Sequence, residues 1–335
     1  MKVESHPLFF LSSVLVGRNR NAFCIVRPPG HHAGINGLLD DGESCGFCIF
    51  NNVAAGALHA IEDEKLLCNR CAIVDIDVHH GNGTEEIVRR CNDPSKLFFF
   101  SIHLFDNEKK KKNPGQFAYK FYPGTGDEDD LALNIINVPI CPLWKDPRPA
   151  DAASVEAKTH GTRSKRAKLD DPEGEQVAPA DDPVAIAAAA AAAANTEESS
   201  SSSASKSPLM QSGREAYRQS IQNRLLPALR AFNPDLILIS AGFDACKNDV
   251  GNARHERGGE KIGLDLEPED YAWTTRKILE IGDICCQGRV VSVLEGGYGR
   301  SVDGTSLDRT QLGECALRHL HSLIDPYDSE NRFTE

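Results

Sequence analysis

Three residues of this sequence have the types and the spacing of a catalytic metal site. Asp77 and His79 follow an apolar run and are two residues apart, so in an extended strand both side chains point the same way. Asp244 follows another apolar run and would supply a second carboxylate. Two carboxylates and one imidazole leave a zinc ion with an open position, which is typical of catalysis. The alternative is that these acids only cap the ends of strands.

Two histidines and a tyrosine could handle protons near this group. His31 and His32 follow a Pro-Pro-Gly turn, and imidazole titrates near neutral pH, which suits general acid–base catalysis. An adjacent pair could equally lie on the surface or bind a metal. Tyr298 lies between glycines that let the backbone approach closely, so its hydroxyl could stabilise an oxyanion. Taken alone, it could equally be a packed aromatic residue in a turn.

The elements that must position these residues alternate along the chain. Short apolar runs, typical of strands buried on both faces, occur at residues 22–26, 72–76, 97–102, 131–138, 236–240 and 290–294. Helical patterns lie between them, at residues 52–62, 83–90, 214–232 and 268–281. This alternation predicts an α/β domain with a mostly parallel sheet covered by helices on both faces. In such sheets ligands bind beyond the carboxyl ends of the strands, where the polar residues above occur.

Composition sets further limits on the chain. Its formal net charge of −12 argues against direct nucleic-acid binding, and its odd count of 11 cysteines disfavours full disulfide pairing. Residues 147–212 are charged, then Ala-rich, then Ser-rich, which predicts a disordered insertion. We therefore expect one domain built from residues 1–146 and 213–325, with a tail at 326–335. Residues 7–17 predict an amphipathic helix, with a signal-peptide core as the alternative.

Six segments of the chain together resemble the zinc-dependent histone deacetylase family, and most of all its class II branch. In chain order they are RPPGHHA, SCGFCIFNN, DIDVHHGNGT, FYPGTG, SAGFDA and LEGGYG. The resemblance implies the fold of the arginase/deacetylase superfamily and hydrolysis of the acetyl amide of N6-acetyl-lysine in histones or other proteins. Only 26 residues precede the first segment. Because the family carries further elements there, we expect the domain to be N-terminally incomplete.

The resemblance also implies roles for the matching residues. The zinc ligands would be Asp77, His79 and Asp244. His32 would be the general base, and His31, oriented by Asp75, would stabilise charge and help protonate the leaving amine. Asn82 would orient His32, and Tyr298 would hydrogen-bond the acetyl carbonyl. The walls of the tunnel for the lysine stem would be Gly46, Phe47, Tyr122 and Gly296. A buried monovalent-cation site, usually for potassium, would be formed by Asp75, Asp77, His79, Ser101 and Ile102.

Substrate, partners and location follow only as expectations. The resemblance implies acetylated histone tails or other acetyl-lysine proteins as substrates, co-repressor subunits as partners, and a role in chromatin regulation and transcription repression. We expect neither direct nucleic-acid binding nor a membrane span. The basic cluster at residues 163–170 resembles a nuclear import signal, which favours the nucleus, with the cytoplasm as an alternative. Two other functions stay open: an acetylpolyamine amidohydrolase, or an inactive deacetylase-like scaffold in a repressor complex.

Overall fold

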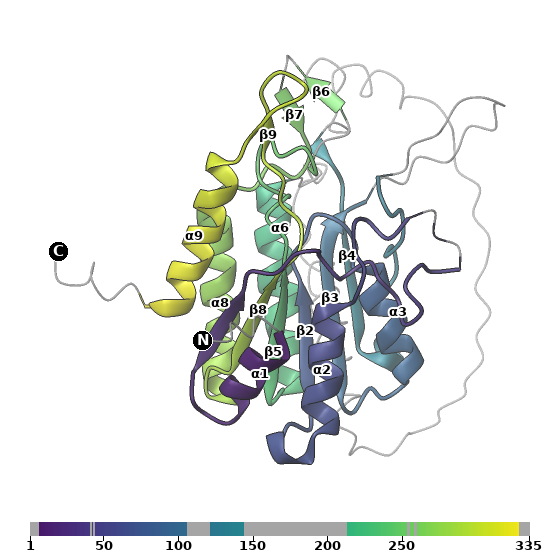
Figure 1. The fold of residues 1–335 in the computed structure, drawn as a ribbon, viewed down its shortest axis with the longest axis vertical. Coiled ribbons are helices and arrows are strands. Elements are labelled where there is room, and N and C mark those ends of the chain that lie inside the picture. The colour runs from purple at the N-terminus through teal and green to yellow at the C-terminus, as the bar shows by residue number, and fades with distance from the viewer. Residues whose placement is uncertain are drawn as a thin grey trace, which may run out of the picture.

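A parallel six-stranded sheet forms the centre of the computed structural model (Figure 1). The structure describes residues 7–40, 42, 44–105, 121–143, 213–252, 255–257 and 260–327. The predicted insertion at residues 147–212 and most of the predicted tail at 326–335 lie outside the described residues. The strands are β1 (Asn21–Cys24), β2 (Cys71–Asp75), β3 (Leu97–Leu104), β4 (Ile135–Ile140), β5 (Leu236–Ala241) and β8 (Val290–Leu294).

The order of the strands explains why the polar residues meet. From one edge to the other the order is β1-β8-β5-β2-β3-β4, and every neighbouring pair is parallel. The chain runs outward from β2 through β3 to β4 and then returns to place β5 on the other side of β2. Ligands of open parallel sheets bind where the strand order reverses in this way. The carboxyl ends of β2 and β5 therefore mark the expected site.

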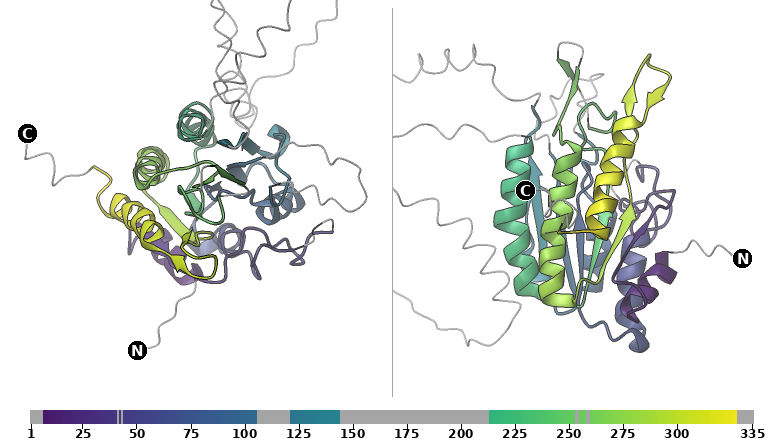
Figure 2. Two further views of the ribbon diagram at one scale, coloured as in Figure 1. Left: turned by 90° about the horizontal axis from the view of Figure 1, so that it is seen from above. Right: turned by 90° about the vertical axis from the view of Figure 1, so that its left-hand side faces the viewer.

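Helices cover both faces of the sheet, as the alternating pattern predicted (Figure 2). One face is covered by α1 (Pro7–Leu15), α2 (Asn52–Glu62) and α3 (Asn82–Cys91). The other is covered by α8 (Pro268–Cys286), α9 (Thr310–Ile324) and a third, continuous helix. This third helix consists of α6 (Arg214–Ser220), a π-helical turn η6 (Ile221–Leu225) and α7 (Leu226–Phe232). The α/β fold class is thus confirmed. None of the described helices has the length and apolar character that crossing a membrane would need.

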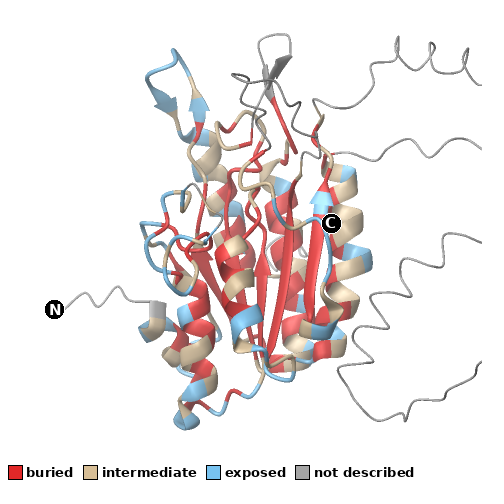
Figure 3. Cartoon of the chain, turned by 90° about the vertical axis from the view of Figure 1, so that its right-hand side faces the viewer, coloured by how far each residue is buried: buried red, intermediate tan, exposed pale blue. Residues whose placement is uncertain are grey.

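Alternate residues of each strand face different helical layers. In β2, Ile73 packs into the cluster that contains Val53 of α2, whereas Val74 packs into the cluster that contains Tyr217 of α6. Both strand residues are almost fully buried, and Figure 3 shows most of the sheet in the colour of buried residues. Burial on both faces is the reason that these strands are mostly apolar and do not alternate with polar residues.

Several predicted boundaries were wrong. The strand predicted at 131–138 begins only at Ile135, because η2 (Leu131–Leu133) is a 3-10 turn that ends at Asn134 with a φ of 55°. Asparagine adopts this left-handed conformation more readily than most residues. The strand predicted at 22–26 ends at Cys24, where Val26 N–H turns back to Cys24 O. The helix predicted at 268–281 continues to Cys286.

Helix α9 and several short elements were not predicted. Gly313 in the first turns of α9 weakens the helix propensity of this segment, and the packing of α9 on α8 stabilises it instead. Two short antiparallel pairs also form: β6 (His255–Arg257) with β7 (Glu260–Ile262), and β9 (Arg300–Ser301) with β10 (Leu307–Asp308). Another 3-10 turn, η1, spans Glu64–Leu66.

His319 joins α9 to the sheet and to α8. Its ring nitrogens lie 2.7 Å from Thr275 Oγ1 of α8 and 2.8 Å from Ser292 Oγ of β8, and the side chain is fully buried. Burial lowers the pKa of His319 to about 3. Because the unfolded chain takes up this proton near pH 6.5, the folded state binds fewer protons between pH 6.5 and 3. The contribution of His319 to stability is therefore complete above pH 6.5 and is lost as the pH falls.

We predict that His319→Gln makes the free energy of unfolding less dependent on pH between 7 and 5. In the unmodified chain, His319 contributes a slope approaching about 1.4 kcal/mol per pH unit below its unfolded pKa. Urea titrations at pH 7, 6 and 5 would measure the slope. His321→Gln is the matched control, because His321 lies on the exposed side of the same helix. Equal slopes in the unmodified chain and in both variants would contradict the prediction.

Candidate active site

Asp77, His79 and Asp244 meet beyond the ends of β2 and β5. The His79 Nδ1 atom lies 3.0 Å from Asp77 Oδ1 and 3.1 Å from Asp244 Oδ2, and one ligand atom from each residue lies within 4.8 Å of the others. Backbone amides fix the remaining carboxylate oxygens. Gly296 N–H donates to Asp77 Oδ2 at 2.8 Å, and Val78 N–H donates to Asp244 Oδ1 at 3.0 Å. Both acids are therefore held by neighbouring strand ends.

The charges of this group match a divalent metal ion. Asp77 and Asp244 are both completely buried, and Asp244 Oδ2 accepts no hydrogen bond. Burial lowers the pKa of His79, but Asp244 and Asp77 outweigh it and raise this pKa to about 9. One imidazolium leaves the two buried carboxylates incompletely neutralised, and an unpaired buried carboxylate is costly. A small cation bound by these oxygen and nitrogen atoms would remove that cost.

A second cluster of metal-compatible side chains is already satisfied. His31, Cys48 and Glu295 also have ligand atoms within 4.8 Å of one another. However, Glu295 Oε2 accepts hydrogen bonds from the backbone N–H groups of Gly30 at 2.6 Å and His31 at 3.1 Å. The His31 backbone and Glu295 are thus already paired with each other, and burial raises the pKa of the Cys48 thiol to about 12. Among the described residues, the group around Asp244 is therefore the better metal site.

Asp77, His79 and Asp244 are called the metal group below. His31 and His32 lie beside it, each with a different partner. His31 Nδ1 is 2.9 Å from Asp75 Oδ2, and His31 Nε2 is 3.8 Å from Asp77 Oδ2. His32 Nδ1 is 2.8 Å from Asn82 Oδ1, and the two imidazole rings lie 4.0 Å apart. The predicted pairing of His31 with an aspartate and of His32 with an asparagine is thus the arrangement in the structure.

The two partners give the histidines different protonation states. Burial lowers the pKa of His31, but the carboxylates of Asp75 and Asp77 more than compensate and raise this pKa well above its usual value. Burial, together with the charges of His31 and His79, lowers the pKa of His32 well below its usual value. A neutral His32 that donates from Nδ1 to Asn82 keeps a lone pair on Nε2. The pair therefore combines one base with one acid.

Tyr298 lies near Asp244, because a Cβ atom on Gly251 would come within 3.0 Å of both residues. It follows β8, between Gly297 with a φ of 126° and Gly299 with a φ of 97°, which are conformations that favour glycine. Its ring contacts Phe47 edge-on, with centroids 6.0 Å apart. Burial and the charges of Asp244 and Asp77 raise the pKa of Tyr298 strongly. The hydroxyl therefore stays protonated and can donate a hydrogen bond.

The predicted tunnel residues border this group. The Tyr122 ring lies edge-on to His32 at 4.8 Å, and its hydroxyl donates to Ser44 O at 2.8 Å. Phe47 is 74% exposed and has a φ of 67°. A Cβ atom on Gly46 would come within 2.3 Å of the His32 ring, and one on Gly296 within 2.2 Å of Asp244 Oδ2. Both glycines are therefore needed where backbone approaches the site.

The predicted monovalent-cation residues lie at adjacent strand ends. Asp75 is opposite Ser101 in the register of β2 and β3, and Ile102 is fully buried. Asp75 Oδ1 accepts a hydrogen bond from Asp77 N–H at 3.1 Å, and Ser101 Oγ lies 2.9 Å from His103 Nδ1. These side chains thus have protein partners, and a cation here stays a prediction.

Sequence reasoning missed two residues that shape the site. Phe121 stacks on the His79 ring with centroids 5.1 Å apart and planes 4° apart. Glu295 joins the end of β8 to the His31 loop through the amides described above. Only the position of Glu295 at a strand end could have indicated this, because the contact depends on how a distant loop is folded.

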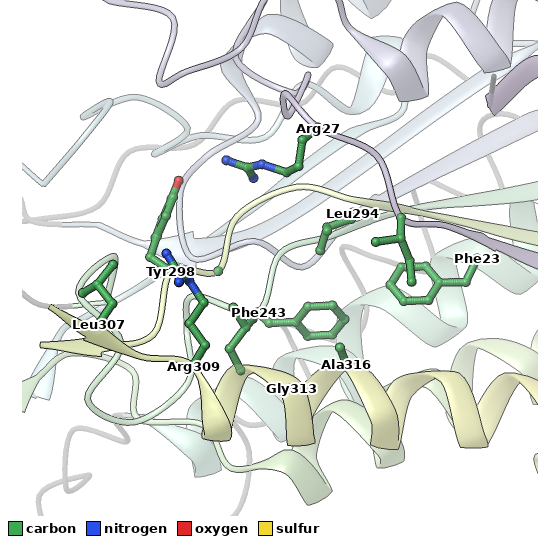
Figure 4. A pocket seen from close by; sticks show the side chains of 12 residues that line it. Phe23, Arg27, Phe243, Leu294, Tyr298, Leu307, Arg309, Gly313 and Ala316 are labelled. Carbon is green, nitrogen blue, oxygen red and sulfur yellow. The ribbon is translucent and has the colours of Figure 1, made fainter. Parts of the chain in front are cut away.

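A hollow of about 350 Å³ opens beside Tyr298 (Figure 4). Its apolar wall includes Phe23, Phe243 and Leu294, and residues of α9 close the other side. Arg27 belongs to the lining too, and its Nη1 donates to Glu295 O at 2.7 Å. In Figure 4 the Tyr298 side chain points away from α9. Tyr298 therefore lines the hollow while its hydroxyl extends away from the helix that closes it.

Comparisons with known proteins agree with one another. Residues 9–311 match the model of the histone deacetylase domain. The chain is 32% identical over 318 residues to type-2 histone deacetylase 2 of Dictyostelium discoideum, covering 92% of this chain and 13% of that protein. It is 27% identical over 324 residues to histone deacetylase 15 of Arabidopsis thaliana, covering 94% and 40%. The crystal structure of the HDA15 HD domain superposes with a TM-score of 0.57 at 25% identity, covering 96% of this chain and 61% of that one.

We predict that Asp244→Asn abolishes tight metal binding. Removing even an outer partner of a metal ligand costs roughly 10–100-fold in affinity, so replacing a charged ligand should cost at least about 100-fold. Elemental analysis after dialysis against zinc would show about one equivalent in the unmodified chain and almost none in the variant. Glu280→Gln, on the exposed side of α8, should keep its metal. An unchanged zinc content in the Asp244 variant would place the metal elsewhere.

Proposed function

The chain belongs to the histone deacetylase family, and from this premise we propose that it is a zinc-dependent amide hydrolase that removes acetyl groups from lysine side chains of proteins. The chain spans only 13% to 40% of the length of the relatives compared above. One observation carries the proposal: a three-ligand metal group, an imidazole pair with opposite pKa shifts and a protonated tyrosine share one end of the sheet.

Asp77, His79 and Asp244 would hold the zinc ion. When bound there, zinc polarises the amide carbonyl and makes water more acidic. Two carboxylates and one imidazole are a ligand set of catalytic zinc sites, and the three protein ligands leave a position open. This assignment is supported by the buried Asp244 Oδ2, which has an ion-pair contact with His79 but no hydrogen-bond partner, and by the absence of cysteine from the group.

The side chains around this group can carry out the proton transfers of amide hydrolysis. The attacking water gives a proton to His32, whose Nε2 lone pair is free while Nδ1 donates to Asn82. The new C–O bond converts the acetyl carbon to a tetrahedral centre, and the Tyr298 hydroxyl donates a hydrogen bond to its oxygen. When the C–N bond breaks, His31, kept protonated by Asp75, assists protonation of the lysine nitrogen. Acetate and an amine leave.

The walls of the site suit a neutral, extended substrate stem. Acetyl-lysine carries no charge on its side chain, so aromatic and glycine walls can hold its methylene groups without desolvating an ion. Tyr122 and Phe47 would supply such walls beside His32 and Tyr298 respectively. A monovalent cation near Asp75, Ser101 and Ile102 remains a proposal that rests on the family resemblance.

The biological setting is also a proposal. We propose acetylated histone tails or other acetyl-lysine proteins as substrates, co-repressor subunits as partners, and a nuclear location. The acidic net charge of −12 suits basic substrate tails. The basic cluster at 163–170, on which the nuclear location rests, lies outside the described residues.

The test is turnover of an acetyl-lysine peptide by the full chain. We expect acetate release that a chelator abolishes and that added zinc restores, because the metal group is required for the reaction. N-acetylputrescine is the comparison substrate. Turnover of the acetylpolyamine alone would contradict the proposed substrate class and would identify an acetylpolyamine amidohydrolase. A well-folded sample without metal-dependent turnover of either compound would identify an inactive scaffold.

We predict that Tyr298→Phe lowers kcat for the peptide by about 100-fold or more and changes KM much less. Removing one oxyanion donor typically costs this much, because the hydrogen bond strengthens in the transition state. Steady-state kinetics with fluorescent acetyl-lysine peptides would measure both constants. Tyr327→Phe is the control, because Tyr327 is half exposed near Asp283, remote from the metal group. A Tyr298 variant with full kcat would refute the assigned role.

A further inference from the structure

Asp249 is a buried acid that the proposed reaction does not use. It is 3% exposed and follows Asp244 by five residues. Its Oδ2 accepts hydrogen bonds from the backbone N–H groups of Tyr298 at 2.9 Å and Gly299 at 2.6 Å, and its Oδ1 accepts one from Gly251 N–H at 2.8 Å. One side chain thus accepts hydrogen bonds from three backbone amides, two of which belong to the segment that carries Tyr298.

The Tyr298 segment lies between two strand ladders. The pairing of β8 with β5 ends at Leu294 and Ala241, and β9 begins only at Arg300. Between them Gly297 turns the chain, so the amides of Tyr298 and Gly299 have no strand partner. Buried amides need acceptors, and Asp249 supplies them. In return Val250 N–H donates to Gly299 O at 3.0 Å, which ties the two segments together.

Gly251 sets how closely the two segments approach. A Cβ atom at this position would lie 2.8 Å from the Asp244 Cβ atom and 3.0 Å from the Tyr298 ring. The glycine therefore lies between the metal ligand and the aromatic ring, and any side chain would push them apart. The turn at residues 244–252 consequently contains three residues that affect this part of the site. They are the candidate metal ligand Asp244, the acceptor Asp249 and the glycine that separates Asp244 from the Tyr298 ring, Gly251.

We propose that Asp249 is a positioning residue that holds the Tyr298 hydroxyl at a fixed distance from the metal group and so contributes to kcat through Tyr298. The kinetic part of this inference rests on the proposed function. Its structural part does not, because the anchoring of Tyr298 can be measured in a protein without activity.

Asparagine cannot replace Asp249 here. All three partners are N–H donors, and both carboxylate oxygens accept. An asparagine side chain has only one acceptor oxygen, and its NH₂ group would face at least one backbone donor. Asp249→Asn should therefore release part of the Tyr298 segment while it preserves the size of the side chain. Displacements of about 1 Å in a catalytic group can cost up to about 100-fold in rate.

A double-mutant cycle with Tyr298→Phe tests whether Asp249 acts through the tyrosine hydroxyl. With the zinc-loaded full chain, we expect Asp249→Asn to lower kcat about 10-fold or more. In the Tyr298→Phe background the same change should lower kcat less than about 2-fold, because the hydroxyl is already absent. A loss of the same factor in both backgrounds would overturn the proposal, as would full activity of the single variant. If Asp249→Asn fails to fold, Asp249→Ser replaces it in the same cycle with the same expected outcomes, because it removes the carboxylate that accepts from Tyr298 and Gly299 and leaves Asp244 and Gly251 unchanged.

Backbone amide NMR provides the readout that is independent of activity. The Tyr298 and Gly299 amides should resonate downfield in the unmodified chain, as amides that donate to a carboxylate do, and should shift upfield and exchange faster in the Asp249→Asn variant. Asp303→Asn is the matched control, because Asp303 also accepts from two backbone amides, those of Thr305 and Ser306, in the exposed β9–β10 turn. It should leave kcat and the Tyr298 amide unchanged. Tyr298 and Gly299 amides that do not respond to Asp249→Asn would refute the anchor, even in a protein without deacetylase activity.

Discussion

The site depends on two buried carboxylates whose charge the protein does not neutralise by itself. Asp77 and Asp244 are fully buried at the point where the strand order of the sheet reverses. Among the described residues, His79 contacts both carboxylates, and His31 lies 3.8 Å from Asp77 while it is paired with a third buried acid, Asp75. Placing two acids there is unfavourable unless a cation joins them. Backbone amides of Gly296 and Val78 nevertheless hold both acids in place. The backbone of the protein thus fixes the positions of both carboxylates.

The surrounding residues follow from that constraint. The charge of Asp77, together with Asp75, keeps His31 protonated, and the resulting positive neighbour helps to keep His32 neutral. Burial, together with the charges of Asp244 and Asp77, raises the pKa of Tyr298. The buried acids therefore help to set different protonation states for His31 and His32 and favour a protonated Tyr298. Glu295 and Asp249 are carboxylates of another kind, because each is satisfied by backbone amides and organises a loop instead of binding a cation.

The sequence predicted the metal group and the histidine pair because their positions depend on local rules. Side chains that alternate beyond a strand point the same way, and the ends of parallel strands share one edge, so Asp77, His79 and Asp244 could be brought together without coordinates. Asp249 and Glu295 could not be found in this way. Their partners are backbone amides of loops that are 49 and 265 residues away in sequence, and loop conformation has no periodic signal. The start of β4 was not predicted for a similar reason. Asn134 adopts a left-handed conformation, so the strand begins at Ile135, and the apolar run at 131–138 does not reveal this turn.

The most direct test of this account is X-ray absorption at the zinc edge of the zinc-loaded chain. The account predicts a first shell made only of nitrogen and oxygen, at about 2.0–2.2 Å, from one imidazole, two carboxylates and an exchangeable ligand. A sulfur neighbour at about 2.3 Å would contradict it, because that distance identifies cysteine and would place the metal at the cluster of Cys48, His31 and Glu295.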